Sequence, residues 1–246
     1  MALTIEDCSL EPLSDSLTIA YAVSLGVFAF AELVTFVLTR PSKPRESVVY
    51  TNILFTLQIV LYTAFLLGQG AFFEEHLQIC LPWLRWLVYT FSCAFLAYKI
   101  AKMSRMTVTA TILFVSMISL TLALGAFSAA SATVNKRWVW FGVGFWPYLI
   151  ALLVLYKAQS RGLFVFVLVT WSFYPIIYLL GPALLNQFSL TVESWLYLAS
   201  DGFTKIGFEI YDRYAEDQKR RETVLPTENI SKGPELLYAS RPTSRR

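Results

Sequence analysis

Residues 162–185 read GLFVFVLVTWSFYPIIYLLGPALL and contain no charged side chain. A helix that crosses the hydrocarbon core of a bilayer needs about 20 predominantly apolar residues. A backbone surrounded by lipid must satisfy its hydrogen bonds internally, which a helix does within one segment. We therefore predict that this stretch is a transmembrane helix.

Six further apolar blocks of similar length lie elsewhere in the chain. They cover residues 17–39, 47–72, 78–101, 106–130, 138–156 and 190–212. At about 20 residues per crossing, seven helices with their loops account for most of the 246 residues. We expect an all-α membrane protein with seven transmembrane helices and no second folded domain.

The composition argues against several other classes of protein. The chain is 56% hydrophobic and 15% charged, with a mean hydropathy of +0.55, whereas average soluble domains carry about 25% charged residues. The long apolar blocks exclude a disordered chain and disfavour a single soluble core. A net charge of +3 gives no reason to expect nucleic acid as a partner. The three cysteines and single histidine form no metal-binding pattern.

Basic residues are concentrated in alternate loops. The first, third and fifth loops contain Arg40, Lys43, Arg45, Lys102, Arg105, Lys157 and Arg161. Because short basic loops stay on the cytoplasmic side of a membrane, the N-terminus is expected outside and the C-terminus inside, with the plasma membrane as the location. Residues 1–16 then form an extracellular segment, residues 17–220 the membrane domain and residues 221–246 a flexible cytoplasmic tail.

Six ionisable residues lie inside the predicted helices, where charges are costly and usually functional. They are Glu32, Arg85, Lys99, Asp201, Lys205 and Glu209. The last three are spaced by four residues and therefore share one face of the last helix. Asp201 and Lys205 fit a simple ion pair. They also fit a lysine that forms a Schiff base with an aldehyde, its positive charge balanced by Asp201.

The quoted stretch favours an apolar ligand for this lysine. Trp171, Tyr174 and Tyr178 follow one another at i, i+3 and i+7 and form one aromatic face. Pro175 permits a kink between them. Aromatic residues are also common in ordinary helix packing. Together with a buried Lys205, however, they favour a conjugated apolar aldehyde as the ligand.

Several motifs resemble those of the microbial rhodopsins. Residues 201–205, Asp-Gly-Phe-Thr-Lys, are similar to the Asp-x-x-x-Lys motif at which this family attaches retinal. Residues 171–178 are similar to its Trp-x-x-Tyr-Pro-x-x-Trp motif, with Tyr in place of the last Trp. Residues 62–70 resemble Tyr-x-x-x-Leu-Leu-Gly-x-Gly, and residues 137–141 resemble Arg-Phe-Val-Trp-Trp. Arg85 corresponds to the arginine that the family keeps beside its counterions.

The resemblance implies all-trans retinal bound to Lys205, with Asp201 as its counterion and a hydrogen bond from Tyr62 to Asp201. The polyene is then expected between Tyr89 and Trp171. The other pocket residues that it implies are Tyr174, Tyr178, Pro175, Phe141, Gly125, Ser92 and Cys93. It further implies a photoreceptor rather than an enzyme, with retinal, the bilayer, small ions and copies of itself as partners.

Three positions depart from the proton pumps of that family. Three, seven and fourteen residues after their arginine, these pumps place Asp, Thr and Asp; here the positions are Val88, Ser92 and Lys99. Val88 cannot accept a proton, and Lys99 is a poor replacement for an acid that returns one. Outward pumping of protons is therefore disfavoured, and pumping of sodium ions likewise.

Three functions remain open. A light-gated anion channel, with chloride as the favoured ion, leads because the loss of a carboxylate and the gain of Lys99 make the pathway more positive. An inward proton transporter of the schizorhodopsin type also has an apolar residue, a Ser and a Cys at the positions of Val88, Ser92 and Cys93. It uses a Glu where this chain has Lys99. The third function is a photosensor that signals through a separate protein.

The expected ion pathway combines charged and polar side chains. Its candidate residues are Arg85, Gln58, Tyr62, Glu32, Lys99, Glu193 and Glu209. Gln58 stands one turn before Tyr62, where a well-known anion channel has a gating Glu. Glu32 is expected either to face Lys99 or Glu209 in a cytoplasmic gate or to make a structural polar contact.

Two features are expected on the outer side of the membrane. Glu193 matches the position of a proton-release Glu in bacteriorhodopsin. Without an acceptor at Val88, we expect it to line an outer vestibule or to have no role. Cys8 and Cys80 either form a disulfide, because that side is oxidising, or remain free thiols.

Overall fold

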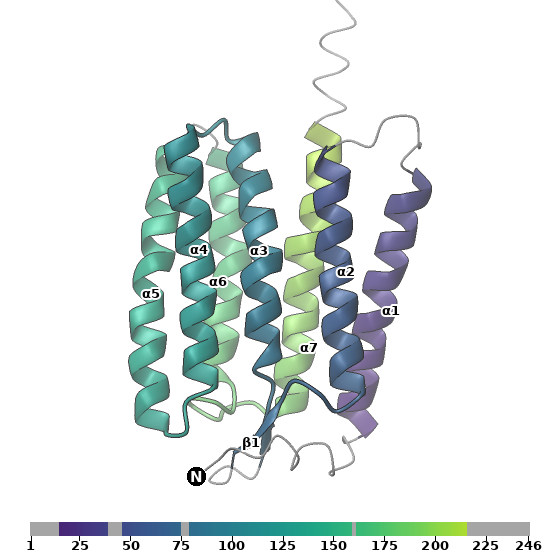
Figure 1. The fold of residues 1–246 in the computed structure, drawn as a ribbon, viewed down its shortest axis with the longest axis vertical. Coiled ribbons are helices and arrows are strands. Elements are labelled where there is room, and N and C mark those ends of the chain that lie inside the picture. The colour runs from purple at the N-terminus through teal and green to yellow at the C-terminus, as the bar shows by residue number, and fades with distance from the viewer. Residues whose placement is uncertain (1–14, 39–45, 75–78, 159–160, 216–246) are drawn as a thin grey trace, which may run out of the picture. The chain divides into compact units, whose positions relative to one another are not determined.

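Seven α-helices make up most of the part of the chain that the structure, a computed structural model, describes, namely residues 15–38, 46–74, 79–158 and 161–215. The helices are α1 (Asp15–Leu38), α2 (Glu46–Leu66), α3 (Leu84–Met103), α4 (Val108–Ala129), α5 (Val134–Lys157), α6 (Arg161–Leu180) and α7 (Leu190–Asp201) (Figure 1). A π-helical segment, η2 (Gly202–Ile206), follows α7. The expected all-α class with seven helices is confirmed.

The chain divides into two units by its internal contacts, residues 1–205 and residues 206–246. In the first unit each helix from α1 to α6 packs on the next one along the chain, and α7 also packs on α1. The helices run side by side (Figure 1), and the packing of α7 on both α6 and α1 closes them into a ring. Every helix therefore has an outer face and a face that points into the ring.

The distribution of polar side chains suits a bundle embedded in lipid. Large apolar residues lie on the outside, such as Val108, which is 77% exposed, and Phe36, which is 72% exposed. Arg85, Asp201 and Lys205 are instead no more than 2% exposed. Charged groups inside membrane proteins face the bundle interior because lipid cannot solvate them.

Five of the helices are long and apolar enough to cross a membrane by themselves: α1, α2, α4, α5 and α6. The third helix contains Arg85, Lys99 and Lys102 and is less apolar. The seventh is short as an α-helix because it continues in the π-helical turn of η2. The third and seventh helices are therefore not recognisable as membrane spans by length and hydropathy alone. They complete the ring because they pack on neighbouring helices.

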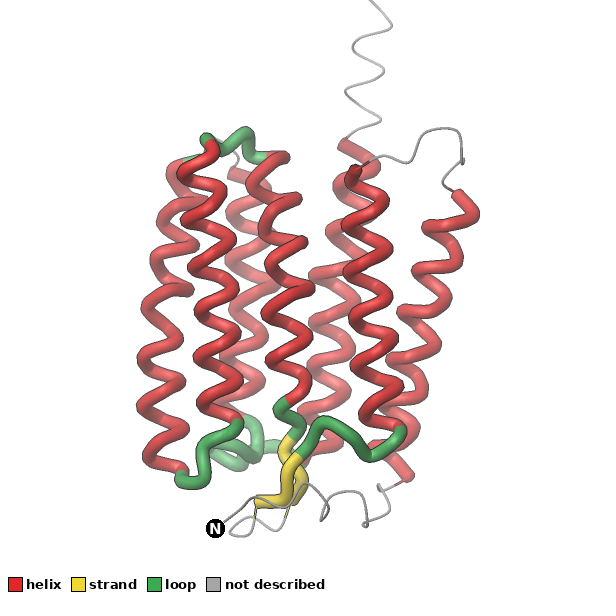
Figure 2. The backbone as a smooth tube through the Cα atoms, viewed as in Figure 1, coloured by secondary structure: helices red, strands yellow, loops and turns green. Residues whose placement is uncertain are grey.

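A short antiparallel hairpin replaces helix at two places where the sequence predicted it. Strand β1 (Phe72–Glu74) pairs with β2 (Ile79–Leu81), although residue 72 and residues 78–101 were expected in helices (Figure 2). The second helix ends at Leu66 because Gly68 and Gly70 adopt left-handed backbone angles, with φ of 69° and 78°. Such angles suit glycine and stop a right-handed helix.

The sixth helix also ends earlier than expected, at Leu180 instead of residue 185. Gly181 still donates its backbone N–H to Ile177 O at 2.8 Å, but Pro182 comes next. The residue before a proline avoids helical backbone angles, which favours a turn at this point. The last helix then begins at Leu190, where the Ser189 side chain accepts a hydrogen bond from the backbone N–H of Val192.

Some expectations fall outside the described residues. These are the N-terminal segment up to residue 14, the tail of residues 221–246, and the alternatives for Cys8 and the side chain of Cys80. The expected domain boundaries therefore stay predictions.

The substitution Gly70→Ala is expected to lower the stability of the protein by about 1–3 kcal/mol. A Cβ atom at residue 70 would lie 2.5 Å from Leu84 Cβ, and φ of +78° is unfavourable for alanine. Thermal unfolding of the protein in detergent measures the loss. Gly26→Ala is the matched control because a Cβ at that helical position meets nothing within 4 Å. Equal unfolding temperatures for the two variants would contradict this account of the α2–α3 connection.

Candidate functional site

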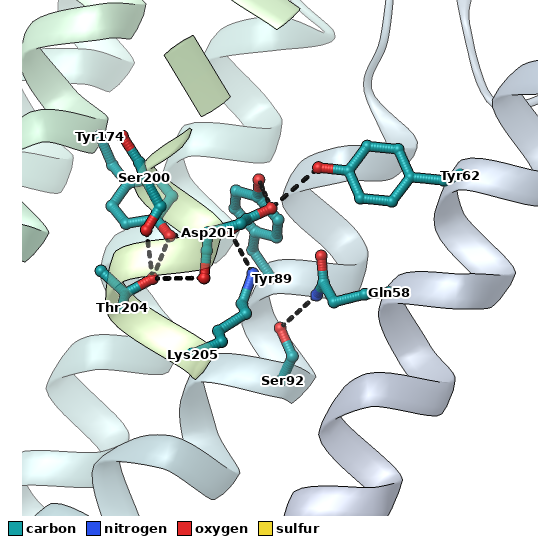
Figure 3. A network of polar contacts seen from close by, with 9 residues as sticks. All are labelled: Gln58, Tyr62, Tyr89, Ser92, Tyr174, Ser200, Asp201, Thr204 and Lys205. Atoms are coloured by element: carbon teal, nitrogen blue, oxygen red, sulfur yellow. Dashed lines mark hydrogen bonds and ion pairs between the residues drawn. The ribbon is translucent and has the colours of Figure 1, made fainter. Parts of the chain in front are cut away.

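Asp201 is the centre of a network of buried polar side chains (Figure 3). Its Oδ2 atom accepts hydrogen bonds from the hydroxyls of Tyr62 at 2.9 Å and Tyr89 at 2.7 Å, and its Oδ1 atom accepts one from Tyr174 at 2.7 Å. The three tyrosines come from α2, α3 and α6, and Asp201 itself is 0% exposed. The expected bond from Tyr62 to Asp201 is confirmed. Three O–H donors stabilise the carboxylate as an anion.

Lys205 lies beside this carboxylate. Its Nζ atom forms an ion pair with Asp201 Oδ1, and both side chains are fully buried. The same Nζ atom lies 4.2 Å from the centre of the Tyr89 ring, within cation–π range. A buried ion pair offsets the cost of desolvation only when its geometry is good and its other polar atoms are satisfied. The hydrogen bonds from the tyrosine hydroxyls satisfy the carboxylate oxygens of Asp201.

The backbone around Lys205 departs from the α-helix. Asp201 is the last residue of α7, and Lys205 lies in the π-helical turn η2. Thr204 Oγ1 donates to Ser200 O at 2.7 Å and lies 2.6 Å from the Tyr174 hydroxyl. Single π-helical turns inside helices occur frequently at functional sites. Here the turn is held by a side chain of α6.

An apolar cavity lies next to the ion pair, between α3, α4, α5 and α6. Eight of the residues expected around a ligand line it: Tyr89, Cys93, Gly125, Phe141, Trp171, Tyr174, Pro175 and Tyr178. Tyr89 and Tyr174 belong both to this cavity and to the network around Asp201. The lysine nitrogen therefore lies at the polar end of an aromatic cavity.

Ser92 is the exception among the expected pocket residues. It is absent from the residues that line the cavity and accepts a hydrogen bond from Gln58 Nε2 at 3.3 Å. Both side chains are 0% exposed, and Gln58 Oε1 has no hydrogen-bond partner. Gln58, expected in the ion pathway, thus lies with Ser92 on the α2–α3 side of Lys205 (Figure 3).

The cavity has further lining residues that the sequence analysis missed. They are Trp86, Ile118, Thr121, Leu122, Trp140, Gly144, Phe145 and Tyr148. Periodicity contained a signal for some of them, because Trp86, Tyr89 and Cys93 follow at i, i+3 and i+7 on α3 and share one face. A Cβ at Gly125 would lie 2.7 Å from Trp86 Cε3, so the glycine allows this tryptophan to approach α4.

Tyr178 connects the far end of the cavity to a structural cluster. Its hydroxyl donates to Ser128 Oγ at 2.9 Å, and Ser128 Oγ donates to the backbone oxygen of Arg137 at 2.8 Å. The Arg137 guanidinium donates to the backbone oxygens of Ser131 and Ala183. Tyr178 is thus tied by hydrogen bonds to α4 and α5, and through Arg137 to the loop after α6.

Arg85 and Glu193 occupy the interior nearer to the hairpin end of α3. Arg85 Nη1 lies 4.0 Å from Glu193 Oε1, and Arg85 Nη2 donates to Ser194 Oγ at 3.5 Å. The Arg85 guanidinium also lies 4.2 Å from the centre of the Tyr197 ring. Glu193 and Tyr197 precede Asp201 on α7 by two turns and one turn. This cluster therefore adjoins the Asp201 network along α7.

Lys99 lies in the opposite half of the bundle. It is 6% exposed and donates to Thr51 Oγ1 at 2.8 Å. It follows Ser92 by seven residues on α3, about 10 Å along the helix axis. Glu32 Oε1 accepts a hydrogen bond from Thr56 at 2.7 Å. Lys99 and Glu32 each form a hydrogen bond with a hydroxyl group on α2. Whether Glu32 belongs to a gate or makes a structural contact stays a prediction.

Glu209, the remaining expected pathway residue, belongs to the second unit. Its Oε1 atom pairs with Arg213 Nε at 2.9 Å within that unit. Asp201 and Lys205 thus form an ion pair in the first unit, and Glu209 forms one with Arg213 in the second. A role of Glu209 in a gate stays a prediction.

The comparison with protein families gives one match. A family model described as a bacteriorhodopsin-like protein matches residues 15–218, which span all seven helices and η2. No curated protein sequence matches the chain.

Solved structures provide further similarity. Schizorhodopsin 4 shares 26% sequence identity, with 79% of this chain and 97% of that chain covered and a TM-score of 0.72. The light-driven proton pump rhodopsin of Coccomyxa subellipsoidea shares 21%, with 80% and 95% covered and a TM-score of 0.72. Halorhodopsin, a light-driven chloride pump, shares 19%, with 85% and 98% covered and a TM-score of 0.73. The last two similarities show the fold alone.

The pairing of Lys205 with Asp201 is open to a double-mutant test. Lys205→Met is expected to destabilise the ligand-free protein by about 3–5 kcal/mol, because it leaves a carboxylate buried without its cation. Lys205→Met combined with Asp201→Asn is expected to recover most of this loss, because no charge then remains unpaired. Thermal unfolding in detergent measures both. A double variant no more stable than Lys205→Met would show that the pair does not stabilise the bundle.

Proposed function

Because the chain belongs to the bacteriorhodopsin-like family, we propose that it is a photoreceptor in which Lys205 binds all-trans retinal as a Schiff base and that light opens an anion path through the bundle. Members of this family bind retinal through a Schiff base to a lysine. They are multi-pass membrane proteins and act as light-driven transporters or sensors, not as enzymes.

The residues next to Lys205 suit such a group. The cavity walls are almost entirely aromatic or aliphatic, which matches a long apolar chain with a ring, and Trp171 stacks on Phe114 behind them. The cavity begins at Tyr89, whose ring is in contact with Lys205 Nζ. Bound retinal supplies the absorption of light and a change of shape that the protein lacks by itself. The protein residues orient it, exclude water and balance its charge.

Asp201 is the proposed counterion. Its carboxylate holds a positive charge at Lys205 Nζ, and Tyr62, Tyr89 and Tyr174 hold the carboxylate in place. Val88, one turn before Ser92 on α3, offers no oxygen that could accept a proton. This arrangement disfavours outward transport of protons, because the residue that replaces the acceptor is a hydrocarbon.

The observation that supports passage of anions is the buried charge of Lys99. The third helix contains no Asp or Glu, and α2 has only Glu46, at its first residue. The interior between Lys205 and Lys99 is lined by neutral groups from these helices, including Gln58 and Thr51. A pathway lined by a buried cation and neutral donors favours anions over cations.

The proposed orientation follows from the basic loops. With the C-terminus in the cytoplasm, Lys99 lies in the cytoplasmic half of the membrane and Arg85 with Glu193 in the outer half. Arg85 and Glu193 then form an outer vestibule, and Gln58, with its unpaired Oε1 atom, forms the constriction next to Lys205. We place the protein in the plasma membrane, as a homo-oligomer.

Inward transport of protons is the second candidate. It is supported by the 26% identity to schizorhodopsin 4. The resemblance inferred from the sequence also implies it, through Val88, Ser92 and Cys93. Lys99 argues against it, since a cation replaces the acid of that pathway. Electrical recordings separate the two candidates.

If Lys205 binds retinal, the full chain supplied with all-trans retinal is expected to show an absorption band in the visible region. Lys205→Ala is expected to abolish the band, because a Schiff base needs a primary amine and no lysine is among the described residues that line the aromatic cavity. Lys136→Ala is the control, since this exposed lysine of α5 lies outside the cavity. A visible band that survives in Lys205→Ala would contradict the assignment.

Voltage-clamp recordings under light test the transport of anions. The reversal potential of the photocurrent is expected to follow the chloride gradient when chloride is replaced by a large organic anion. Lys99→Gln is expected to reduce the chloride conductance roughly fivefold, equivalent to about 1 kcal/mol of lost attraction. Lys136→Gln should leave it unchanged. A current of one sign at every voltage that follows pH would support inward proton transport instead.

A further inference from the structure

Besides the cavity next to Lys205, the protein has a groove at the ends of α3, α4 and α5 that lie far from the hairpin. It has a volume of about 580 Å³ and is lined by the turn between α3 and α4 and by the last residues of α5. Among the residues that the structure describes, its polar lining comes from Ser104, Arg105, Thr107 and Lys157 and includes no Asp or Glu. The groove is separate from the cavity beside Lys205, with which it shares no residue.

Ser104 is the observation that points to a ligand in this groove. It is 7% exposed, and its buried Oγ atom has no hydrogen-bond partner within the part of the chain that the structure describes. Buried hydroxyls in proteins are almost always hydrogen-bonded, so an unpaired one needs an explanation. A ligand oxygen in the groove that Ser104 lines would satisfy it.

The charge of the groove indicates that the ligand is an anion. Arg105 and Lys157 are both exposed at its rim, on the turn after α3 and at the end of α5. The fourth helix begins at Val108, directly after Thr107, and directs the positive end of its dipole to the same place. Two cations, a helix N-terminus and a serine hydroxyl are together the groups that bind phosphate oxygens in proteins.

A neighbouring groove indicates where the rest of the ligand lies. It lies on the surface between α3 and α4 and shares Met106 with the basic groove; its other lining residues are the apolar or aromatic Tyr98, Val108, Ile112 and Val115 and the polar Lys102, Thr111 and Ser116. This surface is mostly apolar and belongs to helices with exposed hydrophobic faces, which suits contact with lipid chains. A free phosphate ion would use only the basic groove, whereas a lipid would use both.

We propose that the groove formed by Ser104, Arg105 and Lys157 binds the phosphate of an anionic phospholipid, whose acyl chain lies in the groove along Met106 and Ile112. Ser104 donates its hydroxyl to a phosphate oxygen, and Arg105 and Lys157 balance the charge. The lipid thereby joins the α3–α4 turn to the end of α5. This site does not depend on the chemistry proposed for Lys205.

Native mass spectrometry of the full chain in detergent tests the site with phosphatidylglycerol as the probe. Arg105→Gln and Lys157→Gln are each expected to weaken retention of the lipid about fivefold, the effect of one basic residue at a charged membrane surface. Ser104→Ala is expected to weaken it about tenfold, because a hydrogen bond to a charged group is lost. Ser104→Ala should not lower the unfolding temperature of the lipid-free protein, since its Oγ atom has no partner to lose.

Two controls make the outcome decisive. Lys136→Gln removes an exposed charge from the opposite end of α5 and should leave retention unchanged. Phosphatidylcholine, which has no net charge, should be retained more weakly than phosphatidylglycerol. Equal retention of both lipids, or equal retention by wild type and Arg105→Gln, would overturn the proposal. Binding of inorganic phosphate at these residues without retention of phosphatidylglycerol would overturn the choice of a lipid.

Discussion

A charged lysine inside a lipid-embedded bundle is stable only when an anion lies next to it, and the rest of this structure is arranged around that requirement. Taking each ion out of water costs several kcal/mol, and the attraction between them offsets this only with good geometry. Asp201 provides the anion for Lys205, and hydroxyls from α2, α3 and α6 hold Asp201. The hydrogen bonds that stabilise the ion pair therefore also join three helices to α7.

The surroundings of this pair determine the proposed function more than the pair itself. On one side along α7, Arg85 is balanced by Glu193. On α3, Val88 offers no oxygen that could accept a proton, and Lys99 is a buried cation that donates to Thr51 Oγ1. The proposed anion path therefore combines a buried cation at Lys99 with a hydrocarbon side chain at Val88. The proposed preference for anions therefore depends mainly on two side chains of one helix, Val88 and Lys99.

The sequence predicted the features that depend on local pattern. The lengths of the apolar blocks predicted the seven helices. The four-residue spacing predicted that Lys205 and Asp201 lie next to each other on one face of the last helix. The hairpin was missed because it depends on the left-handed angles of Gly68 and Gly70. The contact of Ser92 with Gln58 could not be predicted either, since a helical period does not say which neighbouring helix a face meets. For the same reason, the sequence does not predict which side chains of α2 and α3 contact each other.

The absorption spectrum of an Asp201→Asn variant loaded with all-trans retinal tests the central claim most directly. Measured at mildly alkaline pH without halide, it isolates the role of Asp201 as the anion that keeps a positive charge at Lys205. The account predicts that the variant loses its visible band in favour of near-ultraviolet absorption and regains the band when acid or chloride is added. A visible band identical to that of the wild type under these conditions would contradict it.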